Sequence, residues 1–295
     1  MMKIIVAVLA AAVIAVCAWW LFFRIEPPDI PFAEPLADGT PIDFARIEAT
    51  LPLTPEDLQK MTPRNLRALS QEQVDQIYAR LEAGPIPDGP FDGDLFFPRG
   101  TDSSRFAEVV GGGVDGGLKG FAANLNVAKL EFLGARLWRG KVFDSDARIL
   151  RNRIRSLDSL DVLLDEAEER ELDALYDDEL GQALLFPAKL YCGQSLLDGR
   201  RESIIIDYAY TDDLPGYLEK LDHLVGRNGL RIRDEIRMVR PGLYLGRAYM
   251  DRVFVLNFTL YNEAIAEGAA DGGAAARGRE PCWAGEQDRT LSTAL

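Results

Sequence analysis

The amino-acid sequence predicts a mainly β protein, an antiparallel barrel with flanking helices, preceded by a single transmembrane helix. Three observations lead to this prediction. Residues 4–23 form an uninterrupted uncharged run, and about 20 apolar residues in a helix match the hydrocarbon core of a bilayer. Helix-start signals follow between residues 51 and 84. From residue 130 onward, short alternating or β-branched runs bounded by turn residues are typical of strands.

The first 24 residues are predicted to anchor the protein in a lipid bilayer through residues 4–23. Lys3 precedes the apolar run, and Trp19-Trp20 near its end is typical of a membrane interface. A cleavable signal peptide is the alternative, because small residues lie within the run. The run continues to Phe23, which favours an uncleaved, single-pass anchor. Residues 25–295 carry 31 basic and 47 acidic side chains, a net charge of −16, and we expect this body on the extracytoplasmic, periplasmic side of the membrane.

Two short regions follow the predicted anchor. Five prolines between residues 25 and 50 predict an extended linker. Residues 51–84 are predicted to form a short helical region, with helix starts at Thr54, Thr62 and Ser70 that carry the capping residues of a helix N-terminus. The apolar stripe that follows Ser70 ends near Gly84, where prolines and glycines begin. These residues mark the start of the predicted β-barrel domain, residues 85–263.

The predicted barrel domain consists of short strands with two helical insertions. The first strand covers residues 94–97, after turns at Asp88-Gly89 and Asp92-Gly93. Later strands are expected over 130–133, 136–143, 149–154, 184–196, 203–210, 231–239, 243–250 and 253–261, and helices over 156–176 and 217–225. Residues 264–295 are rich in Ala and Gly and are predicted to be a disordered tail.

Two turn signals set the predicted strand register. Asp198-Gly199 predicts a two-residue hairpin loop, which pairs Tyr191 with Ile206. Pro241-Gly242 predicts the next turn, which places Asp234 opposite Tyr249. Alternation along residues 231–239 then puts one set of side chains in the interior (Ile232, Asp234, Ile236 and Met238) and the other in solvent (Arg231, Arg233, Glu235 and Arg237).

Asp234, Arg247 and Tyr249 therefore form a predicted polar group on an apolar interior surface. A buried charge needs a partner, because its desolvation costs several kcal/mol. In one interpretation Asp234 and Arg247 form a structural ion pair. In the other, the group lines a cavity and orients a ligand, while aromatic side chains hold the apolar part of that ligand. The candidate ligand-binding residues of the second interpretation are Asp234, Arg247, Tyr249, Trp138, Met238, Phe254 and Phe258.

The segment from Leu137 to Phe143 resembles the opening strand of lipocalin-like barrels. It is also similar to a family of small bacterial proteins of unknown function with a Gly-x-Trp-x-Gly motif, whose later strands resemble residues 233–239 and 243–246. Trp138 and Gly140 match that motif, whereas Arg136 replaces its first glycine. The resemblance covers about residues 130–262 and implies an antiparallel lipocalin-like barrel with no established chemistry. Trp138 is then expected to close the barrel floor or to contact the ligand.

Composition and motifs exclude several classes of function. A net charge of −14 would repel a nucleic acid backbone. The single histidine and three cysteines, without a C-x-x-C pair, argue against a structural zinc site, and no cofactor is expected. The glycines at 111–117 lack the lysine of a phosphate loop, and the acidic run 165–171 lacks calcium-loop spacing. Cys192 and Cys282 either form a disulfide or remain a buried and a loose cysteine.

The predicted function is that of a membrane-anchored barrel that binds a small hydrophobic or amphipathic ligand, such as a lipid. This function calls for an apolar cavity above about 300 Å³. One alternative is a metal-free enzyme that uses Asp234 or Asp207 as acid or base, assisted by Tyr249 or Arg247. The other is a structural or assembly protein with a solid barrel.

Overall fold

The computed structural model describes residues 25–34, 42–97, 137–155, 175–270 and 280–282. The predicted anchor, the strand expected at 130–133, the glycine-rich stretch and the acidic run lie outside these residues, as does nearly all of the helix expected over 156–176. Within the described ranges, none of the helices has the length and apolar character needed to span a membrane.

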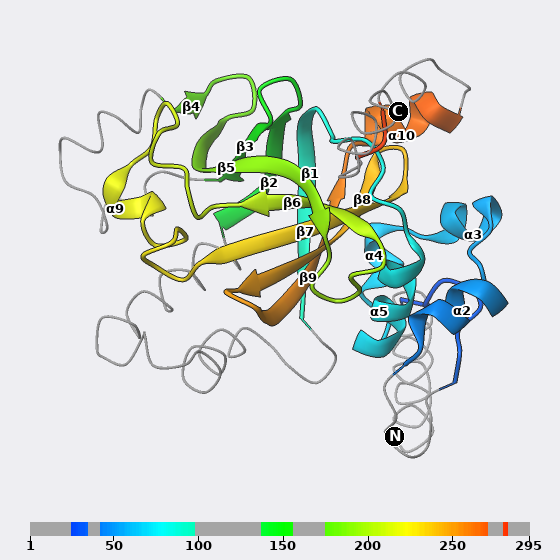
Figure 1. The fold of residues 1–295 in the computed structure, drawn as a ribbon. Helices are drawn as coiled ribbons and strands as arrows, with labels where there is room; N and C mark the ends of the chain where they lie inside the picture. Colours follow the sequence, from blue (N-terminus) through cyan, green and yellow to red (C-terminus); the bar gives the residue numbers. More distant parts are fainter. Residues whose placement is uncertain (1–24, 35–41, 98–136, 156–174, 271–279, 283–295) are drawn as a thin grey trace, which may run out of the picture.

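Eight antiparallel strands of the described chain close into a barrel (Figure 1). They are β1 (Gly89–Phe96), β2 (Trp138–Asp144), β3 (Ile149–Ile154), β5 (Gln182–Gln194), β6 (Glu202–Asp207), β7 (Ile232–Arg240), β8 (Leu243–Met250) and β9 (Val253–Tyr261). Each pairs with the next in this order, and β9 pairs with β1, so the meander closes. The two-residue strand β4 (Tyr176–Asp177) pairs with the start of β5. This topology is compatible with the predicted lipocalin-like barrel.

The first strand begins earlier than the sequence predicts. β1 starts at Gly89, and Asp92-Gly93, expected as a turn, lies inside it. Gly93 serves close packing instead, because a Cβ atom there would lie 2.1 Å from the ring of Trp138. Gly140 on β2 has a φ of 134°, and a Cβ atom would lie 2.0 Å from the carbonyl oxygen of Phe91. The Trp-x-Gly pattern therefore lets β1 and β2 approach closely around the indole ring.

Four short helices pack together on the outside of the barrel (Figure 1). They are α2 (Phe44–Thr50), α3 (Pro55–Lys60), α4 (Pro63–Leu66) and α5 (Gln71–Arg80). Capping boxes at Thr54, Thr62 and Ser70 confirm the three predicted helix starts. Helix α2 lies inside the range expected to be an extended linker, because all the prolines of that range precede it and Asp43 caps its N-terminus.

Two further helices also differ from the prediction. Helix α9 (Glu219–Asp222) is shorter than the expected helix over 217–225. Helix α10 (Glu263–Ala270) occupies the start of the expected disordered tail, where the side chain of Asn262 accepts a hydrogen bond from the N–H of Ile265. This contact caps the helix, so the tail prediction is wrong for these residues.

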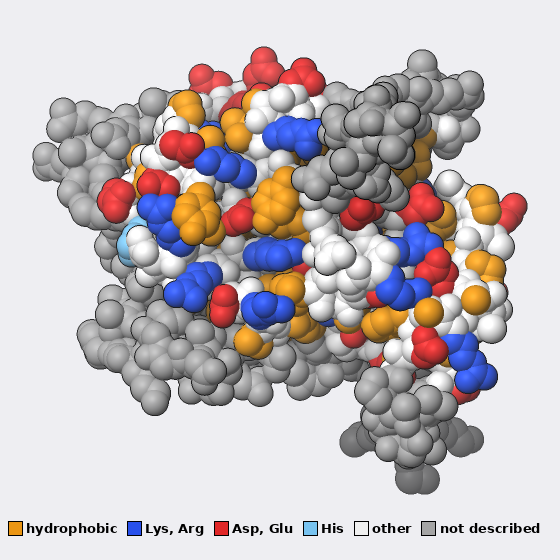
Figure 2. Space-filling model, in the orientation of Figure 1, with side chains coloured by type: hydrophobic (Ala, Val, Ile, Leu, Met, Phe, Trp, Pro, Cys, Tyr) orange, Lys and Arg blue, Asp and Glu red, His pale blue; other side chains and the backbone are white. Residues whose placement is uncertain are grey.

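The described residues form two apolar cores, one on each side of the barrel wall. The inner core fills the barrel and includes Phe91, Leu150 and Phe258. The outer core lies between the helices and strands β1, β7 and β8, and includes Tyr78 and Leu245. Part of the wall is therefore buried on both faces. Elsewhere, the face drawn in Figure 2 has hydrophobic side chains scattered among charged ones rather than gathered in one large patch.

The β5–β6 hairpin differs by one residue from its predicted register. Tyr191 pairs with Ile205, not Ile206, and the ladder ends where Gln194 pairs with Glu202. The connection is therefore longer than a two-residue turn. The carboxylate of Asp198 folds back onto the guanidinium and N–H of Arg200, which stabilises this longer loop.

The β7–β8 hairpin also differs from its predicted register, and the difference changes the candidate site. An irregularity between Met238 and Arg240 moves the ladder by one residue. Asp234 consequently lies opposite Ala248, and Arg247 lies opposite Glu235. Side chains at paired positions share a face of the sheet, so Asp234 and Arg247 lie on opposite faces of the wall.

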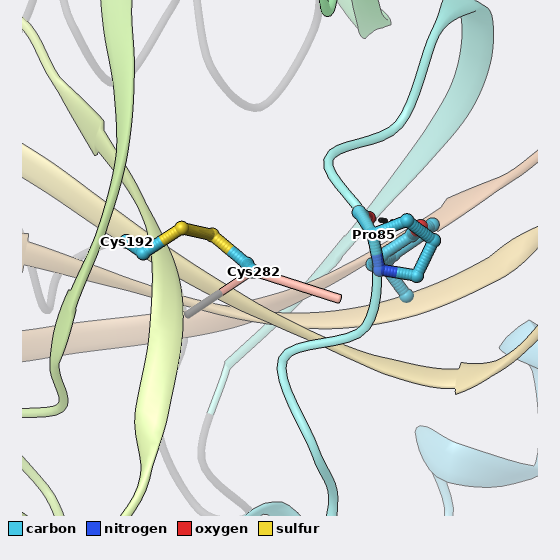
Figure 3. Close-up of a disulfide and its surroundings, with 4 residues drawn as sticks. Pro85, Cys192 and Cys282 are labelled. Atoms are coloured by element: carbon cyan, nitrogen blue, oxygen red, sulfur yellow. Dashed lines mark hydrogen bonds between the residues drawn. A yellow bond between two sulfur atoms is a disulfide. The ribbon is translucent and has the colours of Figure 1, made fainter. Parts of the chain in front are cut away.

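A disulfide joins Cys192 on β5 to Cys282 near the C-terminus (Figure 3). The N–H of Cys282 also donates to the carbonyl of Gly84, at 2.7 Å. Nearby, the carbonyl of Pro85 accepts a hydrogen bond from the hydroxyl of Tyr244. Of the two arrangements that the sequence left open for the cysteines, the structure has the covalent one.

Candidate functional site

A cavity of about 110 Å³, partly open, lies inside the barrel. It lies toward the barrel end where β2 and β7 begin and where β1 and β8 finish, since residues from these strand ends line it. Its walls are mainly apolar and include Leu95, Ile154, Ile232, Met250, Leu256 and Phe258. Four polar side chains that hydrogen-bond to one another also line it: Lys141, Asn152, Tyr208 and Asp234. We call these four residues the polar cluster.

Lys141 is the centre of the polar cluster. Its Nζ atom lies 2.6 Å from the hydroxyl of Tyr208, 2.9 Å from Oδ1 of Asn152 and 3.0 Å from Oδ2 of Asp234. The side chains of Lys141 and Asp234 are 3% and 7% exposed. This ion pair is thus shielded from water, and such pairs are tolerated when their remaining hydrogen-bonding groups find partners.

Asn152 connects the ion pair to the rest of the cavity wall. Its Oδ1 accepts a hydrogen bond from the indole N–H of Trp138 at 2.9 Å. Its Nδ2 donates to the hydroxyl of Tyr208 and to the carbonyl of Phe186, both at 3.1 Å. The amide is thereby fixed in one orientation. The Lys141 ammonium also lies within 6 Å of the ring centroids of Trp138, Tyr208 and Phe258, which adds cation–π attraction.

Burial and charge hold the cluster in defined protonation states. Burial by itself would lower the pKa of Lys141, but the oxygens of Tyr208 and Asp234 outweigh it and the pKa is raised. Burial raises the pKa of Tyr208 to about 12, against the opposing effect of the ammonium. At neutral pH the cluster therefore contains an ammonium and a neutral phenol. A permanently protonated lysine is a poor nucleophile.

Strand alternation explains how these side chains meet. Lys141 on β2 pairs directly with Asn152 on β3. Asn152 lies between Leu150 and Ile154 on the inward face, and Asp234 lies between Ile232 and Ile236. Tyr208 follows Ile204 and Ile206 at the same spacing. The prediction that Asp234 faces the interior is confirmed.

The sequence prediction missed three of the four cluster residues. Lys141 and Asn152 occupy inward positions in β2 and β3, and Tyr208 directly follows β6 at the inward spacing. Apolar inward residues accompany each of them. A polar residue at a position where the alternating residues before and after it are apolar is the signal that identified Asp234. The same signal was present for Asn152 and Tyr208. Lys141 is harder to find, because the register shift between Trp138 and Gly140 interrupts the alternation of β2.

The seven candidate ligand-binding residues separate into two groups. Asp234, Trp138 and Phe258 line the cavity, as does Tyr249, whose hydroxyl accepts a hydrogen bond from Arg247 at 2.9 Å. The remaining three, Arg247, Met238 and Phe254, do not line it. The predicted polar group of Asp234, Arg247 and Tyr249 therefore does not exist, and the partner of Asp234 is Lys141.

Arg247 belongs to a polar layer between the barrel and α5. It forms an ion pair with Asp75 of α5, and its guanidinium lies 4.2 Å from the ring centroid of Phe254. Glu235 and Arg237 lie in the same layer, each with an exposed fraction of 0%. The prediction that these two side chains face solvent is wrong, because α5 and the β5–β6 connection cover the outer face of β7 there.

Two of the residues proposed for acid–base catalysis, Asp207 and Arg247, lie away from the cavity, whereas Asp234 and Tyr249 line it. Asp207 lies in the β6 wall, where its carboxylate accepts hydrogen bonds from the hydroxyl of Tyr191 and the N–H of Ala209. Arg247 is on the opposite face from Asp234. No grouping of three or more His, Cys, Asp or Glu side chains suited to a metal occurs in the part of the chain that the structure describes.

Comparison with known proteins returned no significant match, either to a protein-family model, to a curated protein or to a solved structure. The cavity and its polar cluster are therefore the basis for the function proposed below.

Proposed function

We propose that the barrel binds a small, largely apolar molecule in the cavity above the polar cluster. The observation that carries this proposal is an apolar cavity of about 110 Å³ inside a closed barrel, with polar side chains on one part of its wall. Solid protein interiors have few voids larger than a water molecule. A dry apolar cavity of about 150 Å³ in another protein binds benzene. The cavity here is somewhat smaller, about 110 Å³, so a molecule with a single ring is at the upper end of the size that it can hold.

The size of the cavity narrows the ligand class expected from the sequence. Sites for drug-sized ligands are about 300–1,000 Å³. The cavity is about 110 Å³, so the expectation of a cavity above about 300 Å³ is wrong. A whole lipid would require the inner core to move apart. We therefore propose a compact ligand rather than a lipid chain.

The experiment is a titration of the full chain in detergent micelles with toluene. The chain has four tryptophans, and selective ¹⁵N labelling gives one indole signal for each, with Trp138→Phe used to assign the cavity signal. Toluene is expected to shift the Trp138 indole signal saturably, because this ring lines the cavity. Ala248→Phe fills the cavity and should abolish the shift. If neither toluene nor any single-ring probe of similar size shifts this signal saturably, the barrel is a solid structural element and the proposal fails.

We also propose that residues 4–23 hold this barrel at a bilayer, on the extracytoplasmic side. The uncharged run supports the anchor, and the Cys192–Cys282 disulfide supports the compartment, because disulfides persist where conditions are oxidising. The test is membrane fractionation with alkaline carbonate washing. The full chain should stay with the membrane, whereas a chain lacking residues 1–24 should be released.

A further inference from the structure

Every hydrogen-bond donor of the polar cluster is already used within the protein. The three N–H bonds of the Lys141 ammonium point to Tyr208, Asn152 and Asp234. Both amide N–H bonds of Asn152 are used, by Phe186 and Tyr208. The Tyr208 hydroxyl lies 3.4 Å from Oδ2 of Asp234 and 3.5 Å from Oδ1 of Asn152. The cluster therefore has no donor left for a ligand.

One strong acceptor of the cluster remains without a donor. Oδ2 of Asp234 accepts from Lys141 and Tyr208, whereas Oδ1 receives no hydrogen bond from any residue that the structure describes. Some unpaired polar atoms of the described residues are completely buried, but Oδ1 of Asp234 is not one of them. Asp234 also lines the cavity, so a ligand there can reach this oxygen. A carboxylate oxygen left unpaired in an apolar surrounding costs free energy, which a donor on the ligand would recover.

The charges that line the cavity limit the charge of the ligand. Lys141 and Asp234 are the charged side chains of the described lining, and they neutralise each other. A ligand carboxylate would add an uncompensated negative charge and would find no free donor in the polar cluster. A ligand ammonium would add a second positive charge next to Lys141. Either ion would be desolvated without a partner of its own, which is costly.

We infer that the cavity selects a neutral ligand with a hydroxyl group, an alcohol or a phenol, whose O–H donates to Oδ1 of Asp234. This inference rests on the proposed function and adds the chemical class of the ligand to it. The apolar part of the ligand lies against Leu256, Ile232 and Met250 on the cavity wall.

The test compares four single-ring probes of similar size by the same Trp138 indole signal. Phenol carries the neutral donor, toluene lacks a polar group, benzoate is an anion and benzylammonium is a cation. A hydrogen bond to a charged group corresponds to roughly tenfold or more in affinity. We expect phenol to bind at least about tenfold more tightly than toluene, and both ions to bind more weakly than toluene.

Asp234→Asn provides a test specific to Oδ1. Lys141 and Tyr208 both donate, so the amide oxygen should replace Oδ2 and the amide NH₂ should replace Oδ1. The variant then presents a donor where the native protein presents an acceptor. Its phenol preference over toluene should be lost, and benzaldehyde, which accepts but does not donate, should gain affinity relative to toluene. Lys141→Met/Asp234→Asn should show the same exchange without an unpaired buried ammonium, and it replaces the single variant if that chain does not fold.

The outcomes separate this inference from the proposed function. If toluene binds as tightly as phenol, or if benzoate or benzylammonium binds most tightly, the cavity binds ligands but the inference is wrong. The inference is also wrong if Asp234→Asn and the double variant both keep the phenol preference. If no probe binds, the proposed function fails first.

Discussion

At the residue scale, Asp222 supports the cavity wall from outside the polar cluster. Its carboxylate accepts the N–H of Leu218 at 2.7 Å and the N–H of Phe186 at 3.1 Å. Phe186 lines the cavity with a φ of 51°, in the left-handed region that costs a non-glycine residue energy. Its carbonyl accepts from Asn152. Asp222 and Asn152 thus hold the two sides of one strained residue.

Asp222 predicts a specific pH dependence of stability. Burial raises its pKa to about 7, although its two backbone hydrogen bonds and Arg151 act in the opposite direction. An unfolded aspartate titrates near 3.9. Between these values the folded protein keeps a proton that the unfolded chain has released, so the contribution to stability is full below about pH 4 and is lost as the pH rises through about 7.

Urea unfolding at several pH values between 5 and 8 tests this dependence. Asp222→Asn is neutral at every pH, so its free energy of unfolding lacks this contribution from residue 222. The variant should lose about 1–3 kcal/mol at the lower pH, because an amide cannot accept both N–H groups at the same quality. The deficit should then shrink as the pH rises to 8, where the wild type has lost its advantage. Parallel curves for the two proteins would contradict the assigned role.

At the element scale, the helical layer is fastened to the barrel by buried arginines as well as by apolar contact. Arg237 on β7 is fully buried and donates to the carbonyls of Tyr78, Glu202 and Arg201 and to the hydroxyl of Ser203. Its guanidinium also lies 4.7 Å from the ring centroid of Tyr78. The carbonyl of Tyr78 belongs to the C-terminal end of α5, where a cation is favourable. One side chain therefore connects α5, β7 and the β5–β6 connection.

Arg237→Met is expected to lower the free energy of unfolding by about 3 kcal/mol or more, because several buried carbonyl oxygens lose their donor together. Arg231→Met is the matched control, since Arg231 is an arginine directly before β7 but has an exposed side chain. The control should change stability by less than about 0.5 kcal/mol. Urea unfolding followed by circular dichroism measures both. Equal effects of the two substitutions would mean that Arg237 does not fasten the layer.

The same strand shows how far sequence alone predicts the fold. Strand positions follow from local patterns, so β3, β8 and β9 match their predicted residues. Register depends on loop geometry and on bulges such as the one near Val239, which no local pattern reveals. Strand alternation also placed Glu235 and Arg237 in solvent, which is wrong. Charged residues at every second position of a strand normally indicate a face that water covers. Here a helix far away in sequence covers that face.

At the scale of the whole molecule, the polar cluster forms only because the barrel closes and brings distant strands together. Lys141 and Asp234 are 93 residues apart in sequence, and Tyr208 lies between them on a third part of the wall. The sequence indicated that Asp234 lies inside and needs a partner. It could not identify Lys141, because the two strands face each other across the barrel rather than pairing in a hairpin. The interior position of Asp234 could therefore be predicted from the sequence, whereas its ion-pair partner could not.

The disulfide joins two parts of the molecule that strand pairing does not connect. It links Cys282 to β5 across a sequence separation of 90 residues. A crosslink over a loop of this length lowers the entropy of the unfolded chain and stabilises a fold by up to about 4–5 kcal/mol. Cys192→Ala/Cys282→Ala should therefore unfold at clearly lower urea concentration, and Cys17→Ala, which leaves the disulfide intact, should not. Neither Cys192 nor Cys282 lines the cavity, so under native conditions the double variant should retain the toluene response of Trp138. Loss of that response would instead show that the barrel interior depends on the attached C-terminal segment.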